Sequence, residues 1–191
     1  MKPRLRRMRR SNRPPVTPPL PRRAVVWFPP AELLGGVEAF RAEHDPRARA
    51  IAGHVTLVFP FASALNSVQV AAHVRRVAAR WPLLPVEMSG SDAFEARWLY
   101  LRVTRGRDAL TELHGRLHRG VLAPFLRHDF PYEPHLTIGV APDVEACNAA
   151  LERAAMQLRQ PIKATVHALC VVTLRSDGRI ERGAEIPLGA A

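Results

Sequence analysis

The chain has 191 residues, of which 47% are hydrophobic, and a formal net charge of +11. This length fits one medium-sized domain or two small lobes that share a core. No stretch approaches the roughly 20 apolar residues of a membrane-spanning helix, and the short apolar run 24–28, stopped by Pro29 and Pro30, does not fit a secretory signal. Two cysteines, Cys147 and Cys170, cannot build a disulfide framework, so we expect a cytoplasmic protein.

The excess positive charge is concentrated at the N-terminus. Residues 1–23 contain nine basic side chains, six prolines and no acidic residue. From residue 24 onward, 19 basic residues face 17 acidic ones, so the body of the chain is nearly neutral. We therefore predict a disordered basic tail over residues 1–23 and a folded domain over residues 24–191. Such a tail can hold RNA phosphates electrostatically; a solvated extension and a start codon assigned too far upstream are alternative interpretations.

In the first half of the body, apolar runs alternate with segments of helical periodicity. Residues 24–28 and 53–59 are predicted strands, because each is a short run rich in apolar and β-branched residues. Residues 31–43 and 67–81 are predicted helices, because their apolar residues recur on one helical face. A further short strand is predicted over residues 85–88.

Elements of the same kinds follow in the same order in the second half. The predicted strands are 98–103, 134–140, 165–174 and 180–187, the last two joined by a Ser-Asp-Gly turn. Asp108 is expected to cap a helix whose inner face extends to Val121, and Asp143 is expected to cap another. The offset between matching elements is nearly constant along the chain. It predicts two similar lobes, each of strand–helix–strand–helix–strand type.

The matching central strands of the two halves carry the same four-residue pattern. These segments are His54-Val55-Thr56-Leu57 and His135-Leu136-Thr137-Ile138. Because side chains alternate between the two faces of a strand, the histidine and threonine of each motif share one face, and the apolar residues point into the core. If the lobes pack about a pseudo-twofold axis, both His/Thr pairs converge on one groove.

This set of residues suits chemistry at phosphorus. One histidine can take a proton from the attacking oxygen while the other protonates the leaving oxygen, each contributing about 10²–10⁴-fold. The hydroxyls of Thr56 and Thr137 can donate hydrogen bonds to the non-bridging oxygens, where charge develops. The sequence therefore predicts His54 and His135 as catalytic residues and the two threonines as phosphate-binding residues.

With both motifs in place, the chain resembles the 2H phosphoesterase superfamily, in the branch of 2′-5′ RNA ligase-like and 2′,3′-cyclic phosphodiesterase proteins. The resemblance covers about residues 24–188 and includes Phe59-Pro60-Phe61 after the first motif and Phe130 and Pro134 before the second. It implies an α+β, bilobal fold of two similar lobes. Each lobe would have a mainly antiparallel sheet and helices, and the central cleft would carry both His-x-Thr motifs.

The resemblance also implies a metal-independent phosphodiesterase that needs no cofactor. Its substrate would be RNA or a nucleotide with a 2′,3′-cyclic or 2′-5′ phosphodiester bond, and the reverse ligation is chemically open to it. Either histidine can be the general acid. Relatives carry a basic residue soon after the second motif, but here Gly139-Val140-Ala141 follows. The candidates for a phosphate-neutralising residue are therefore Arg47, Arg49 and Arg175. We expect a monomer with no membrane association.

Several other interpretations remain open at this stage. The protein could be an RNA-binding or scaffolding protein of the same fold with little turnover. The two motif histidines could instead bind a metal ion, with Asp129 or Glu133 as third ligand. His114 and His118 are one turn apart and are expected on a solvated helix face rather than at a metal. Finally, Tyr132 and Trp98 could stack on a base, although packing in the core or at a rim is the expected use of both.

Overall fold

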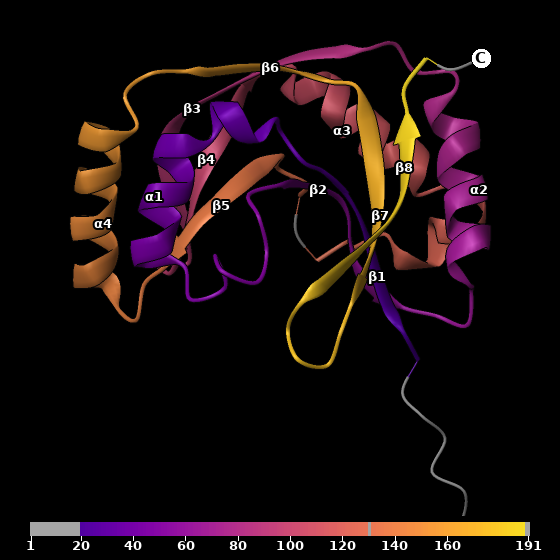
Figure 1. Ribbon diagram of the computed structural model, residues 1–191, viewed down its shortest axis with the longest axis horizontal. Helices are drawn as coiled ribbons and strands as arrows, with labels where there is room; N and C mark the ends of the chain where they lie inside the picture. The colour runs from indigo at the N-terminus through magenta and orange to yellow at the C-terminus, as the bar shows by residue number, and fades with distance from the viewer. Residues whose placement is uncertain (1–19, 130, 190–191) are drawn as a thin grey trace, which may run out of the picture.

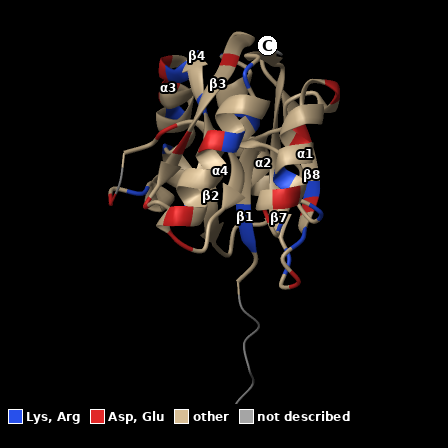
Figure 2. Ribbon diagram, turned by 90° about the vertical axis from the view of Figure 1, so that its left-hand side faces the viewer, with Lys and Arg blue, Asp and Glu red and all other residues tan. Residues whose placement is uncertain are grey.

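The computed structural model describes residues 20–129 and 131–189. Its first strand, β1 (Arg22–Trp27), begins inside the predicted tail. Arg22 and Arg23 therefore belong to the sheet, and Figure 2 shows them in blue at the start of β1. Residues 1–19 of the predicted tail lie outside the described residues, so the tail stays a prediction.

Among the described residues, eight strands form one sheet in which every pairing is antiparallel. After β1 come β2 (Val55–Ala62), β3 (Leu84–Phe94), β4 (Trp98–Arg105), β5 (His135–Val140), β6 (Ile162–Val166), β7 (Ala168–Leu174) and β8 (Ile180–Pro187). In space they lie in the order β6-β3-β4-β5-β2-β1-β7-β8. The expected α+β class with an antiparallel sheet is confirmed.

The sheet consists of two halves of four strands that meet at its centre. The central strands β2 and β5 are joined by a single residue pair, Val55 with Leu136, whereas the neighbouring strands pair over several residues. Figure 1 shows β3, β4 and β5 on one side of this junction and β1, β7 and β8 on the other. The short junction lets the two halves diverge, as expected for two lobes around a cleft.

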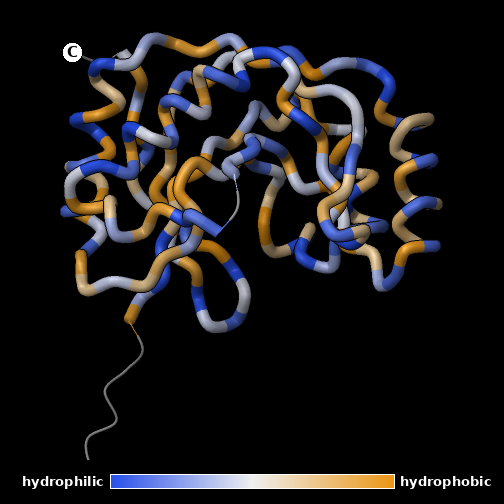
Figure 3. The backbone as a smooth tube through the Cα atoms, turned by 180° about the vertical axis from the view of Figure 1, so that it is seen from behind, coloured by the Kyte–Doolittle hydropathy of each residue, from blue (hydrophilic) through white to orange (hydrophobic). Residues whose placement is uncertain are grey.

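Helices cover the outer side of both halves (Figure 1). The helices are α1 (Gly35–His44), α2 (Ser67–Ala78), α3 (Arg107–Leu117) and α4 (Val144–Gln157), with short 3-10 helices η1 (Ala31–Leu33) and η2 (Gly120–Phe125). Hydrophilic and hydrophobic residues alternate along α4 in Figure 3, as expected for a helix with one packed face. Within the described residues, no helix is long and apolar enough to cross a membrane.

The two lobes are not consecutive halves of the chain, which corrects the sequence-based expectation. Helix α1 packs on β5 and α3 packs on β2, so each helix covers a strand of the other series. Strand β1 gives the physical reason. Five of its six residues are buried, and buried backbone N–H and C=O groups need hydrogen-bond partners. A strand on each side supplies them: β2 from the first half of the chain and β7 from its C-terminal part.

The strand predicted over residues 165–174 is two strands. Strand β6 pairs with β3 in one half of the sheet, whereas β7 pairs with β1 and β8 in the other. The chain crosses between the halves at His167, whose carbonyl oxygen accepts a hydrogen bond from the Leu188 N–H. An apolar run shows that a segment is buried but not which strands it pairs with, so the sequence did not reveal this break.

The two predicted N-caps have different outcomes. Asp143 caps α4, since its side chain accepts a hydrogen bond of 2.8 Å from the Ala146 N–H. Asp108 is not a cap: α3 begins at Arg107, and Asp108 lies within the first turn. The preceding Gly106, with a φ of 80°, takes the cap position in a left-handed conformation that favours glycine.

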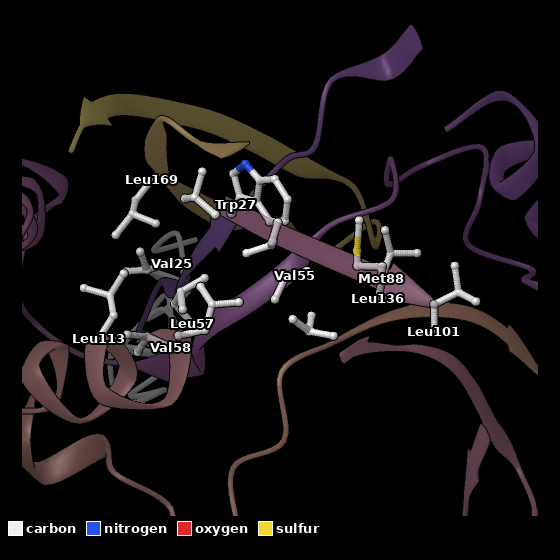
Figure 4. Close-up of a cluster of buried hydrophobic side chains, with 14 of the residues drawn as sticks. Val25, Trp27, Val55, Leu57, Val58, Met88, Leu101, Leu113, Leu136 and Leu169 are labelled. Atoms are coloured by element: carbon white, nitrogen blue, oxygen red, sulfur yellow. The ribbon is translucent and has the colours of Figure 1, made fainter. Parts of the chain in front are cut away.

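One hydrophobic core runs through both halves of the sheet. Figure 4 shows Leu57 and Val58 of β2 near Leu113 of α3, and Leu136 of β5 near Met88 of β3, with Val55 between these groups. Val55, Leu57 and Leu136 are fully buried, and each such side chain stabilises the fold by about 1.5–3 kcal/mol. A smaller apolar cluster lies on the other face of β1 and β7, formed by Ala24, Val26, Cys170 and Val172. This second cluster contributes to the floor of the candidate active site.

Candidate active site

The two motifs lie on the central strands and face one cavity. His54 directly precedes β2, and His135 is the first residue of β5. His54, Thr56, His135 and Thr137 all line a cavity of about 590 Å³. The apolar residues of both motifs are fully buried in the core, so the alternation predicted from the sequence is confirmed.

Strand pairing explains why the four side chains come together. Val55 is paired with Leu136 in an antiparallel register. One residue further in each direction, this register sets His54 opposite Thr137 and Thr56 opposite His135. Each imidazole therefore has a hydroxyl beside it on its own strand and another across the junction.

Both imidazoles are held by the same local hydrogen bond. Nδ1 of His54 is 2.8 Å from the carbonyl oxygen of Ala52, and Nδ1 of His135 is 2.7 Å from that of Glu133. Because a carbonyl oxygen only accepts, Nδ1 carries the proton in both rings. Nε2 of each histidine is then the nitrogen left to accept or donate a proton in the cavity.

The surroundings shift the two histidines differently. Burial lowers the pKa of both imidazoles below the ordinary value of 6.5. Near His54, the positive charges of Arg41 and Arg47 lower the pKa further. Near His135, the carboxylate of Glu133 opposes the effect of burial on the pKa. His54 therefore lies in a more cationic environment than His135 does.

An aromatic ring from the neighbouring strand region lies beside each histidine. The ring centres of Phe28, just after β1, and His54 are 5.7 Å apart. Those of Tyr100 on β4 and His135 are 4.9 Å apart. These contacts restrict the orientation of both imidazoles in addition to the Nδ1 hydrogen bonds.

Two side chains from other elements hold the backbone of β2 at its motif. The hydroxyl of Tyr132 donates a hydrogen bond of 2.9 Å to the carbonyl oxygen of Thr56. Nδ1 of His114 lies 2.7 Å from the carbonyl oxygen of Leu57, at the point where the register between β1 and β2 shifts. The rings of Tyr132 and His114 stack with centres 3.8 Å apart and planes 7° apart. Together they fix the stretch of β2 that carries Thr56.

The predicted solvated face for His114 and His118 is wrong. Both side chains are buried, with 6% and 5% of their surface exposed, and Nδ1 of His118 lies 2.9 Å from the carbonyl oxygen of His114. Burial lowers the pKa of His114 to about 4, so this ring is neutral at ordinary pH. The burial of His114 could have been predicted from the sequence. Leu110, Leu113 and Leu117 form the apolar face of this helix, and His114 lies next to Leu113 at the edge of that face.

Cations surround the cavity, and the sequence identified one of them. Arg47, predicted as a phosphate-neutralising candidate, lines the cavity together with Arg22, Arg41 and Arg127, which were missed. Arg49 and Arg175 do not line it. Arg22 was assigned to the tail, and Arg127 lies in the loop before β5, so no local pattern marked either residue.

Neither predicted third metal ligand is free for that role. Asp129 is paired with Arg127, and Glu133 accepts hydrogen bonds of 2.8 and 2.6 Å from Arg107. Across residues 20–129 and 131–189, no three His, Cys, Asp or Glu side chains are grouped as ligands of one metal ion. The cavity is lined by imidazoles, hydroxyls and guanidinium groups, and the carboxylate of Asp45 in its lining is ion-paired with Arg41. This set suits a phosphate better than a cation.

The remaining predicted aromatic residues take different places. Trp98 lines the cavity, and the guanidinium carbon of Arg47 lies 5.4 Å from the centre of its ring. Tyr132 is packed against His114 and is not part of the cavity lining. The rest of the floor is apolar and comes from β1, β7 and the start of β8: Ala24, Val26, Val172, Leu174 and Ile180.

Fold and motifs together define the class. A junction of two antiparallel strands, each with a His-x-Thr motif facing one cavity, is the arrangement of a 2H phosphoesterase. In agreement with this, residues 29–178 match the 2′-5′ RNA ligase superfamily, and the chain belongs to that superfamily.

Individual relatives agree with this assignment. A presumed phosphoesterase of Geobacillus kaustophilus is 31% identical over 118 residues, which is 60% of this chain and 66% of that protein. Another from Halalkalibacterium halodurans is 34% identical over 119 residues, or 60% of this chain and 67% of that protein. The match thus spans about two thirds of each relative.

Solved structures show the same fold at low identity. LigT of E. coli in complex with 3′-AMP has a TM-score of 0.60 at 18% identity, covering 88% of this chain and 98% of LigT. LigT in complex with ATP has a TM-score of 0.59 at 20% identity, covering 90% of this chain and 99% of LigT. At this identity the likeness establishes the fold alone.

Proposed function

We propose that the protein hydrolyses a 2′,3′-cyclic or 2′-5′ phosphodiester bond in RNA or a nucleotide, with His54 and His135 as general base and general acid. One observation carries the proposal: two imidazoles, each held through Nδ1, share one cavity with two threonine hydroxyls. Membership of the superfamily supports phosphoester chemistry. The capture of 3′-AMP and ATP by LigT, a protein of the same fold, supports a nucleotide as ligand.

In the proposed reaction, one histidine takes a proton from water as its oxygen attacks phosphorus. The bond between phosphorus and a ribose oxygen breaks, and the other histidine gives a proton to that departing oxygen. Thr56 and Thr137 donate hydrogen bonds to the non-bridging oxygens as negative charge develops there. Arg47 at the edge of the cavity offsets the charge of the phosphate. The reverse sequence of proton transfers joins the two ends, so ligation uses the same groups.

The charges around the two imidazoles favour one division of the work. His54 has Arg41 and Arg47 nearby, which favour its neutral form and therefore the role of base. His135 has the carboxylate of Glu133 nearby, which favours its protonated form and therefore the role of acid. We assign His54 as the base and His135 as the acid for the hydrolysis of a cyclic phosphate.

A substrate screen tests the proposed function. The purified full-length protein is incubated with 2′,3′-cyclic mononucleotides, 2′-5′-linked oligonucleotides and, as control, 3′-5′-linked oligonucleotides of the same sequence. We expect turnover of one or both of the first two classes, no turnover of the control, and the same rates with and without EDTA. Binding without turnover would support a binding protein instead. Activity that EDTA abolishes and a divalent ion restores would support the metal-dependent alternative.

A further inference from the structure

A second cavity lies on the helix-covered side of the β2-β1-β7-β8 half. It has a volume of about 990 Å³ and lies between α3 and the C-terminal part of α2 with the segment that follows it. Helix α2 packs on β7 and β8, and α3 packs on β2; both lie in the right-hand part of Figure 1. The cavity shares no lining residue with the active-site cavity, so it is a separate feature of the surface. We call it the α2–α3 groove.

Exposed arginines line both walls of the α2–α3 groove. Arg76, in the last turn of α2, and Arg80, two residues after the helix, are on the α2 side. Arg116 and Arg119 are on the α3 side. The acidic residue in the lining is Glu112, which accepts a hydrogen bond of 3.3 Å from Arg116. The groove therefore carries a clear excess of positive charge.

Most of this charge is not neutralised by the protein. Within the described part of the chain, Arg80 and Arg119 form no ion pair with a carboxylate. The guanidinium group of Arg76 approaches Nδ1 of His73 at 3.5 Å, which leaves its charge uncompensated. Three guanidinium groups are thus available to an anionic ligand.

The indole of Trp81 provides an independent pointer to a ligand. Trp81 lines the groove, and its Nε1 is buried without a hydrogen-bond acceptor among the described residues. A buried donor without an acceptor is unfavourable, and native structures rarely keep one unless something outside the chain supplies the acceptor. A ligand oxygen in the groove can accept this hydrogen bond once the indole turns toward it, because the nitrogen itself is buried in the free protein.

A purely structural explanation accounts for part of the pattern. Cations near helix C-termini interact favourably with the helix dipole, and Arg76 and Arg116 lie in the last turns of α2 and α3. The dipole does not explain Arg80 and Arg119, which follow the ends of the helices. Nor does it explain why guanidinium groups from both walls face one cavity.

We propose that the α2–α3 groove binds the sugar–phosphate backbone of single-stranded RNA away from the bond that reacts. Guanidinium groups on both walls match the repeated anionic oxygens of a phosphodiester strand, and a phosphate or ribose oxygen accepts the Trp81 N–H. The choice of RNA as the polyanion rests on the proposed function. The groove then acts as a second attachment point that selects longer RNA over a mononucleotide.

Charge reversal with a matched control tests the groove directly. The test variant is Arg76→Glu/Arg80→Glu in the full-length protein, and the control is Arg153→Glu/Arg159→Glu, which changes the same charge at exposed positions on and after α4. Fluorescence anisotropy measures the Kd of a labelled 3′-5′-linked RNA of about 12 nucleotides over a range of salt concentrations. Circular dichroism checks that both variants are folded.

We expect the groove variant to bind RNA at least about tenfold more weakly at about 50 mM salt, and the slope of log K against log salt to flatten by about 1.4. The control should stay within about twofold of the wild type. Trp81→Phe should weaken RNA binding to a smaller extent, because it removes the N–H and keeps an aromatic ring. We also expect RNA binding to change the tryptophan emission of the wild type, and this change should be absent in Trp81→Phe.

Two results would overturn the inference. Equal weakening in the groove and control variants would mean that only the total charge matters. Unchanged RNA binding, together with loss of binding to phosphatidylserine vesicles, would assign the arginines to a membrane surface instead. Because the assay measures binding without turnover, a failure of the proposed phosphodiesterase activity would not affect its outcome.

Discussion

The two halves of the candidate active site share their backbone geometry and differ in their charges. In each half a histidine at the start of a central strand is bound through Nδ1 to the carbonyl oxygen two residues before it, with a threonine two residues after it. The difference comes from residues outside this shared geometry: Arg41 and Arg47 act on His54, and the carboxylate of Glu133 acts on His135. Repeated geometry therefore brings two like groups together, and their unlike neighbours give them different charge environments.

The largest expected effect comes from removing either histidine. His54→Ala and His135→Ala should each lower kcat on a cyclic nucleotide by about 10²–10⁴-fold, because each removes one of the two proton transfers. The measurement is steady-state kinetics on the substrate identified in the screen. His167→Ala removes an exposed histidine outside the cavity and serves as control. A folded His54 or His135 variant with near-wild-type kcat would refute the pairing.

Removing the hydroxyls should have the next largest effect. Thr56→Val and Thr137→Val keep the side-chain shape and remove one hydrogen-bond donor from the phosphate, which should lower kcat/KM by about 10- to 100-fold. Similar losses at both sites would support equivalent places in the two halves. Wild-type kinetics in both variants would mean that the threonines do not contact the phosphoryl oxygens.

The β2 half depends on Tyr132, for which the β5 half has no counterpart among the contacts described above. Tyr132→Phe removes the hydrogen bond to the Thr56 carbonyl and should cost about 1 kcal/mol of unfolding free energy and a several-fold loss in kcat. Chemical denaturation and kinetics measure the two effects. A loss of stability without any change in kcat would show that this contact is structural and does not position Thr56.

The smallest expected effect is a shift in the pH profile. The acid must be protonated, so kcat/KM should fall as pH rises through the pKa of His135, which burial holds below 6.5. Removing the negative charge of Glu133 lowers this pKa further, so Glu133→Gln should move the basic limb of the profile to lower pH. Glu152→Gln, an exposed change on α4, is the control. A basic limb that moves upward or stays in place would contradict the assignment of His135 as the acid.

The sequence was sufficient for the centre of this site and insufficient for its periphery. Strand alternation correctly placed Thr56 and Thr137 beside their histidines, because that geometry is local. The same local logic failed where a residue's role depends on a distant partner. Arg22 faces the cavity only because β1 lies between β2 and β7, and His114 is buried because α3 covers β2. These placements depend on the exchange of elements between the lobes, which no local pattern encodes.

The division of proton transfers between the two histidines can be tested with a substrate whose leaving group needs no acid. A nucleoside 4-nitrophenyl phosphodiester releases nitrophenolate, which departs without a proton. We expect the kcat of His135→Ala to be about 10² or more below the wild type on a cyclic nucleotide, but within about tenfold of the wild type on this ester. His54→Ala should stay impaired on both substrates, because the attacking water still needs a base. Recovery of His54→Ala instead, or of neither variant, would contradict the assignment.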